Sequence, residues 1–230
     1  MNWSDFAPER RGAPIEKPRQ RRSMAAGVSW FAAAILLAGC VSPELPRLNL
    51  LRHPAQPQAL VANGAFTVAA PRGFCIDQKT LRDDADGIFV LFGHCAAMSG
   101  DPDRPKPTEA VLLSATFSAE DTAQSDQTQM KLIAEFFASE LGRAVLARSG
   151  QADDVTVQST KLEDGLLILK VEDASDLTDA ARAHSYWRGV SVINGRMSSL
   201  TVMPLKDGAV SDAAQQDLLH RFAVALKDAN

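Results

Sequence analysis

The chain has 230 residues, a formal net charge of −4 at pH 7, 46% hydrophobic residues and 23% charged residues. These values are typical of a soluble globular protein that is long enough to bury a core without a structural metal. Residues 40–230 hold 18 basic and 25 acidic residues, which excludes the basic surface of a nucleic-acid-binding domain, and no basic cluster among them is evident that could hold the protein on anionic lipid.

The first 39 residues have the organisation of an export signal. Residues 25–39 are apolar apart from Ser29, and Arg19, Arg21 and Arg22 precede them. A membrane-spanning helix takes about 20 apolar residues, so this shorter run fits the hydrophobic region of a signal peptide. The positive charges before it favour retention of the start of the chain in the cytoplasm.

Four residues, Leu37, Ala38, Gly39 and Cys40, end this leader. The small side chains at positions 38 and 39 leave the backbone open to a peptidase, and the Cys40 thiol can take a diacylglycerol. The four residues resemble the lipobox of bacterial lipoproteins. The resemblance implies cleavage before Cys40, lipid (including palmitate) on that residue, and a cell-envelope protein facing the periplasm. A chance apolar helix that ends in a buried cysteine is the alternative.

Two export routes fit the leader. Arg21 and Arg22 with an Ala-rich apolar region fit a twin-arginine signal, but Ser23 and Met24 replace the usual Phe-Leu, so ordinary Sec export is preferred. In the lipoproteins that the leader resembles, an aspartate directly after the cysteine is the usual signal for inner-membrane retention. Val41 stands there instead, so the resemblance implies sorting to the outer membrane.

Residues 40–63 are predicted to form an extended tether, because four prolines fix φ and remove amide donors: Pro43, Pro46, Pro54 and Pro57. A single domain is expected over residues 64–230. Short β-rich runs predict its first strands at residues 66–69, 73–77, 88–92 and 110–117. The run at 88–92 is continuously apolar, which is typical of a strand buried on both faces. Residues 83–87 are expected to be a solvated turn, and residues 100–107 a surface loop.

A helical period follows between residues 121 and 148. Five apolar residues recur there at steps of three or four and are predicted to share one buried face: Met130, Ile133, Phe137, Leu141 and Val145. Gly150 is expected to end the helix.

Two hairpins are predicted next, with turns at residues 163–165 and at Asn194 and Gly195, which tolerate positive φ. Their strands are expected at residues 155–157, 166–171, 187–193 and 197–203. Ser211 is expected to cap a final helix. The buried face of that helix is predicted to hold Leu218, Phe222 and Leu226.

Strands therefore come in runs and do not alternate with helices. This order predicts an α+β fold, with an antiparallel sheet of about six or seven strands and two main helices. The element order over about residues 64–230 is similar to the PsbP-like group, which includes small bacterial lipoproteins, and the resemblance implies a curved antiparallel sheet covered by the helices. The resemblance implies binding or assembly roles more often than catalysis.

Cys75 and Cys95 are the cysteines that remain once Cys40 carries lipid. A pair in an exported chain most simply forms a disulfide, which would close a loop of roughly twenty residues and stabilise the fold by about 3 kcal/mol. A redox function is the alternative, although the pair lacks Cys-x-x-Cys spacing.

No catalytic motif occurs in the sequence, whether a Gly-x-Ser-x-Gly elbow, a His-Glu-x-x-His helix or a phosphate-binding loop. No metal or cofactor is predicted, because only His94 lies beside a cysteine and adjacent strand residues point to opposite faces. Acidic residues near His184 could make a paired-carboxylate site, but a solvated loop is the preferred interpretation. These residues are Glu172, Asp173, Asp176 and Asp179.

Tyr186, Trp187 and Arg188 are candidate partner contacts, since these residue types dominate binding hot spots. The alternative is that Trp187 and the strand after it belong to the core. The hypothesis favoured by the sequence is a non-enzymatic, lipid-anchored domain that binds or scaffolds an envelope protein. An envelope hydrolase or small-molecule binder with a site assembled from scattered residues is the alternative.

Overall fold

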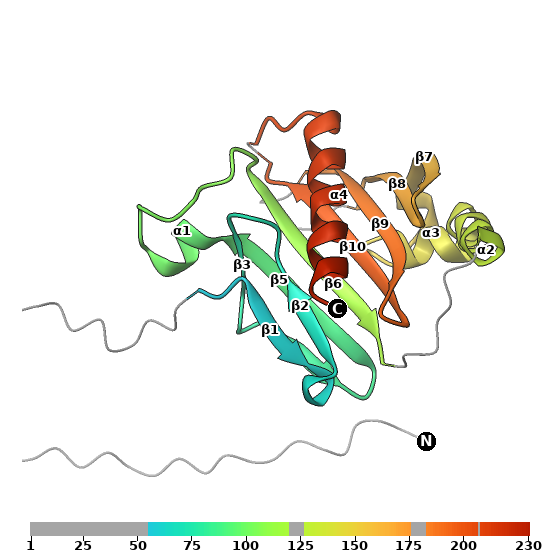
Figure 1. Cartoon of the computed structure of the whole chain (residues 1–230). Helices are drawn as coiled ribbons and strands as arrows, with labels where there is room; N and C mark the ends of the chain where they lie inside the picture. Colours follow the sequence, from blue (N-terminus) through green and yellow to red (C-terminus); the bar gives the residue numbers. More distant parts are fainter. Residues whose placement is uncertain (1–54, 120–126, 176–182, 207) are drawn as a thin grey trace, which may run out of the picture. The chain divides into compact units, whose positions relative to one another are not determined.

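The structure is a computed structural model that describes residues 55–119, 127–175, 183–206 and 208–230 (Figure 1). All of them lie in the unit that runs from Asn49 to Asn230. The leader, Cys40 and most of the predicted tether lie outside the described residues. The described part contains strands in runs and helices between them, which confirms the predicted α+β class.

Eight strands form one open sheet, and two more form a separate hairpin. The strands are β1 (Gln58–Val61), β2 (Phe66–Ala69), β3 (Phe74–Ile76), β4 (Arg82–Asp84), β5 (Gly87–His94), β6 (Val111–Ser118), β7 (Val155–Glu163), β8 (Leu166–Asp173), β9 (Ser185–Ile193) and β10 (Arg196–Pro204). The order in the large sheet is β3-β5-β6-β10-β9-β8-β7, with β4 also beside β5. Every pair is antiparallel, as predicted.

One face of the sheet is covered by the β1–β2 hairpin and by α4 (Asp212–Asp228), which lie in front of it in Figure 1. Ser211 caps α4 by accepting a hydrogen bond from the Ala214 N–H at 3.2 Å, as predicted. The predicted inward residues of α4 are fully buried: Leu218, Phe222 and Leu226. They pack against alternate residues of the central strands, among them Val90, Phe92, Leu113 and Leu200.

The other face carries a second core over β7, β8 and β9. Two helices cover it, α2 (Gln127–Ala138) and α3 (Glu140–Leu146). Met130, Phe137 and Leu146 point inward from these helices. They pack on the strand residues Leu167, Leu169, Val171 and Val190. A short helix, α1 (Cys95–Ser99), follows β5 at the opposite edge of the sheet.

The prediction of a single long helix between residues 121 and 148 is wrong, because α2 ends at Ala138 and α3 begins at Glu140. Ser139 has extended backbone angles and accepts a hydrogen bond from the Gly142 N–H at 3.1 Å, so it caps the second helix. The break shifts the helical phase. Leu141 and Val145, predicted to be buried, therefore lie on the outside.

The first part of the domain also differs from the prediction. β1 lies within the segment predicted as tether, where it pairs with β2 from Gln58 to Val61. Asn63 and Gly64 form the turn between them, with φ of 54° and 86°. An Asn-Gly pair is a strong hairpin signal, and at this position it was hidden by the proline-rich sequence before it.

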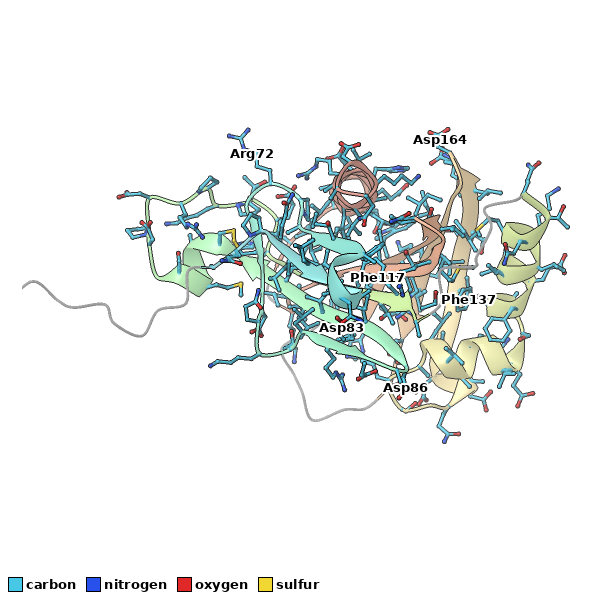
Figure 2. The ribbon with its side chains drawn as sticks, turned by 60° about the horizontal axis from the view of Figure 1, so that its bottom comes forward. Arg72, Asp83, Asp86, Phe117, Phe137 and Asp164 are labelled. Carbon is cyan, nitrogen blue, oxygen red and sulfur yellow. A yellow bond between two sulfur atoms is a disulfide. The ribbon has the colours of Figure 1, made fainter. Side chains whose placement is uncertain are left out.

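Two predictions near β5 need correction as well. β4 lies partly within the predicted turn at residues 83–87, because this exposed strand pairs with the start of β5 (Figure 2). β5 itself is not buried on both faces. Its side chains alternate, so that Ile88 and Val90 are buried while Phe89 and Leu91 are partly exposed.

Candidate interaction surface

The outer side of α2 and α3 carries four large apolar side chains that are open to solvent. Leu132 is 60% exposed, Phe136 38%, Leu141 68% and Val145 60%. We call these four residues the α2–α3 surface. Single exposed apolar residues are ordinary, but several on adjoining helices are typical of a surface that binds another molecule.

The break at Ser139 produces this surface. Leu132 and Phe136 lie four residues apart on α2, and Leu141 and Val145 lie four apart on α3, so each pair shares one side of its helix. Gly142 packs against the backbone of Phe136 so closely that a Cβ atom would overlap its carbonyl oxygen. The start of α3 is therefore held directly against the end of α2.

The charges on the same helices balance. Lys131 and Arg143 are cationic, and Glu135 and Glu140 are anionic. Arg143 also donates a hydrogen bond to the Ala138 carbonyl oxygen at 2.9 Å, which ties it to the junction of the helices. A surface with balanced charges does not select a strongly acidic or basic partner, so apolar contact dominates what it can bind.

The α2–α3 surface lies at the opposite edge of the sheet from the first described residue. Ala55 and Gln56 lie beside β3, where the Ile76 N–H donates to the Gln56 carbonyl oxygen. The helices α2 and α3 pack on β7 and β8, which end the sheet on the other side (Figure 1). At the usual spacing between strands, the two edges are roughly 30 Å apart.

The structure places the three candidate partner contacts apart from this surface. Tyr186 is buried on the α2–α3 side of the sheet, where its hydroxyl donates to the Leu146 carbonyl oxygen at 3.0 Å. Trp187 is buried on the α4 side, and its Nε1 donates to Asp212 Oδ1 at 3.2 Å. The core interpretation of Trp187 is the one that fits these contacts. Arg188 is partly exposed and lies over the Tyr186 ring.

The acidic segment that begins at the end of β8 is not simply a solvated loop. Asp173 is fully buried, and its Oδ2 accepts a hydrogen bond from Arg148 Nε at 2.8 Å. Burial favours the neutral carboxyl and raises the pKa of Asp173, but hydrogen bonds from Ser175 and Arg148 outweigh burial and hold the pKa below its usual value. The contact ties the end of α3 to the end of β8. Asp176 and Asp179 lie outside the described residues.

Cys75 and Cys95 are joined by a disulfide, with their Cα atoms 4.9 Å apart, which confirms the predicted pairing. Both are buried in a small cluster with Ala55, against which Met98 packs. The bond fixes α1 to β3. Cys40 lies outside the described residues.

Hollows in the surface of the described residues include two with different linings. One of about 530 Å³ is lined by His94, Ala96, Ala97, Gly100, Pro102 and Lys106. A smaller one of about 220 Å³ lies beside β4 and the start of β5 and includes Arg82, Asp84 and Asp86. The carboxylates with a lowered pKa line neither hollow: Glu109, Glu163, Asp173 and Asp212.

Comparisons with known proteins give no relative: no family model, curated protein or solved structure matches the chain. In the part of the chain that the structure describes, no helix is long and apolar enough to cross a membrane. Within the same residues, histidine, cysteine and carboxylate side chains do not gather in threes around a possible metal position.

Proposed function

We propose that this protein is a lipid-anchored component of the bacterial cell envelope, held in the outer membrane by lipid on Cys40 and facing the periplasm. Its domain binds an envelope protein through the α2–α3 surface and has no catalytic role of its own. The lipobox at residues 37–40 supports the anchor. The buried disulfide between Cys75 and Cys95 supports an oxidising compartment such as the periplasm.

The observation that carries the binding function is the position of the α2–α3 surface. Ala55, the first described residue after the proposed anchor, lies at the β3 edge, while Leu141 and Val145 are exposed at the β7 edge. A domain suspended by its β3 edge holds the opposite edge away from the anchor. That position favours an apolar surface of another protein over the lipid of the same membrane as the occupant.

The PsbP-like element order supports the same function, since the likeness implies binding and assembly. A small-molecule binder is the second candidate, and the hollow beside His94 and Lys106 favours it. Its lining has only these two titratable side chains among small residues, so it offers fewer specific contacts than the α2–α3 surface.

The test compares two valines of similar exposure. Val145 is 60% exposed on α3, and Val224 is 53% exposed on the outer side of α4. Val145→Asp and Val224→Asp are each expressed in the native envelope, and their neighbours are captured by crosslinking. We expect one envelope protein to be captured by the wild type and by Val224→Asp, and at least tenfold less of it by Val145→Asp.

Equal capture by the two variants would contradict binding through this surface. Near-ultraviolet circular dichroism of both purified variants serves as the folding control. A partner lost equally from both variants would also count against the proposal, because an aspartate on α4 leaves the α2–α3 surface unchanged.

A further inference from the structure

The connector between β5 and β6 lies across Ala55, the first residue that the structure describes. Arg104, in the middle of this connector, donates from Nη1 to the Ala55 carbonyl oxygen at 2.6 Å. The same nitrogen lies 3.7 Å from Cys75 Sγ, and that sulfur lies 3.4 Å from the Ala55 oxygen. Ala55 is only 7% exposed, so the first described residue is enclosed by the connector and the disulfide.

The start of the connector is fixed to β3. Cys95 is bonded to Cys75, and its N–H donates to the Gly73 carbonyl oxygen at 2.9 Å. Gly73 has a φ of +89°, and a Cβ added to it would come within 2.8 Å of Pro107 Cγ. The connector therefore packs tightly on the turn before β3.

The far end of the connector is fixed as well. The Glu109 carbonyl oxygen lies 2.8 Å from His94 Nε2, within hydrogen-bond distance, and the Glu109 side chain pairs with Arg221 of α4 at 2.7 Å. Arg104 is thus held between two anchored ends.

The residues after Ala55 are held less firmly. The Gln56 carbonyl oxygen accepts from Ile76, and the Pro57 carbonyl oxygen accepts from Ala70, each at 2.8 Å. Beyond them, β1 pairs with β2 over four residues in a sheet of two strands. β2 packs in the core, but only Val61 of β1 is buried, so β1 depends mainly on its pairing with β2. Tension on the chain before Ala55 would therefore separate β1 from β2 unless Ala55 itself is fixed.

We propose that Arg104, the disulfide and the packed connector form a clamp that fixes Ala55 to β3 and so holds β1 in place when the chain before Ala55 is pulled. If the clamp opens, residues 55–61 can leave the domain and add about 25 Å of extended chain before β2. The importance of this length rests on the proposed lipid anchor, whereas the clamp itself does not.

Hydrogen exchange in the purified full chain tests the clamp. The readouts are the amides of Ala70 and Ile76, which donate to the segment that the clamp holds. Arg104→Ala removes the bond to Ala55, and Gly73→Ala displaces Pro107. Arg72→Ala is the matched control, because Arg72 points into solvent from the same turn (Figure 2). The backbone amides that pair β9 with β10 report on the stability of the fold as a whole.

We expect Arg104→Ala and Gly73→Ala to speed exchange at Ala70 and Ile76 about tenfold or more, with β9 and β10 unchanged and Arg72→Ala like the wild type. If Ala70 and Ile76 exchange at the same rate in Arg104→Ala as in Arg72→Ala, the proposed clamp is wrong. Faster exchange in all strands alike would also overturn it, because the contact would then support the whole fold. A Cys40 without lipid would refute the proposed anchor and leave these results standing.

Discussion

Gly142 lies directly against the carbonyl oxygen of Phe136, with no room between them for a side chain. The contact forms where α2 gives way to α3, and it holds Leu141 and Val145 in their outward positions. A glycine is thus required here by close packing, although alanine is the better helix former.

Gly142→Ala is therefore expected to destabilise the fold by about 1–3 kcal/mol, because the added methyl group must push the two helices apart. Urea denaturation followed by circular dichroism measures the free energy of unfolding. Helix propensity alone predicts the opposite sign, a gain of about 1 kcal/mol. A stabilised variant would contradict the close contact with Phe136.

The ion pair between Arg148 and Asp173 should make stability depend on pH. The pKa of Asp173 is lowered in the folded state by bonds from Ser175 and Arg148 that outweigh burial, whereas the unfolded chain has the ordinary value of 3.8. The carboxylate therefore stabilises the fold above the unfolded pKa, and this contribution is lost as the pH falls through the folded pKa. Stability should decline below about pH 4.

Asp173→Asn should lower the free energy of unfolding at pH 7 by about 3 kcal/mol, since it leaves Arg148 without its anionic partner. The free energy of unfolding of the variant should also fall less steeply below pH 4 than that of the wild type. Exposed Asp153 lies nearby, and Asp153→Asn is the control. Thermal melts between pH 3 and 7 compare the three proteins. An Asp173→Asn curve parallel to the wild type would show that this carboxylate does not titrate with folding.

Local signals in the sequence predicted most of the fold. The turn at Asn194 and Gly195, with φ of 45° and 76°, and the cap at Ser211 depend on neighbouring residues alone. The break at Ser139 was missed because the apolar period continues through it to Val145. The cap at Ser139 and the packing of Gly142 on Phe136 distinguish two helices from one, and the apolar period reports neither of them.

The candidate site was harder to predict for the same reason. Tyr186 and Trp187 have the composition of a binding hot spot, but the pairing of β9 between β8 and β10 places both inside. Leu141 and Val145 have the composition of a core, and the helix break exposes them. Residue type was a poor guide here because burial depends on which strands and helices become neighbours.

The disulfide gives a third prediction. Under denaturing conditions without reductant, the exported protein should show no free thiol at Cys75 or Cys95, and two after reduction, as counted by alkylation and mass spectrometry. Replacing both cysteines with serine should cost about 3 kcal/mol, because the unfolded chain regains the freedom of a loop of roughly twenty residues. Two free thiols in the unreduced exported protein would contradict the bond.

The anchor is the central claim, and the mass of the N-terminal peptide of the protein isolated from bacterial envelopes tests it most directly. We predict that this peptide begins at Cys40 and carries a diacylglycerol on its sulfur, and that Cys40→Ser leaves the protein without lipid and outside the membrane fraction. An envelope protein that retains residues 1–39, or a Cys40 found as a free thiol, would contradict the account.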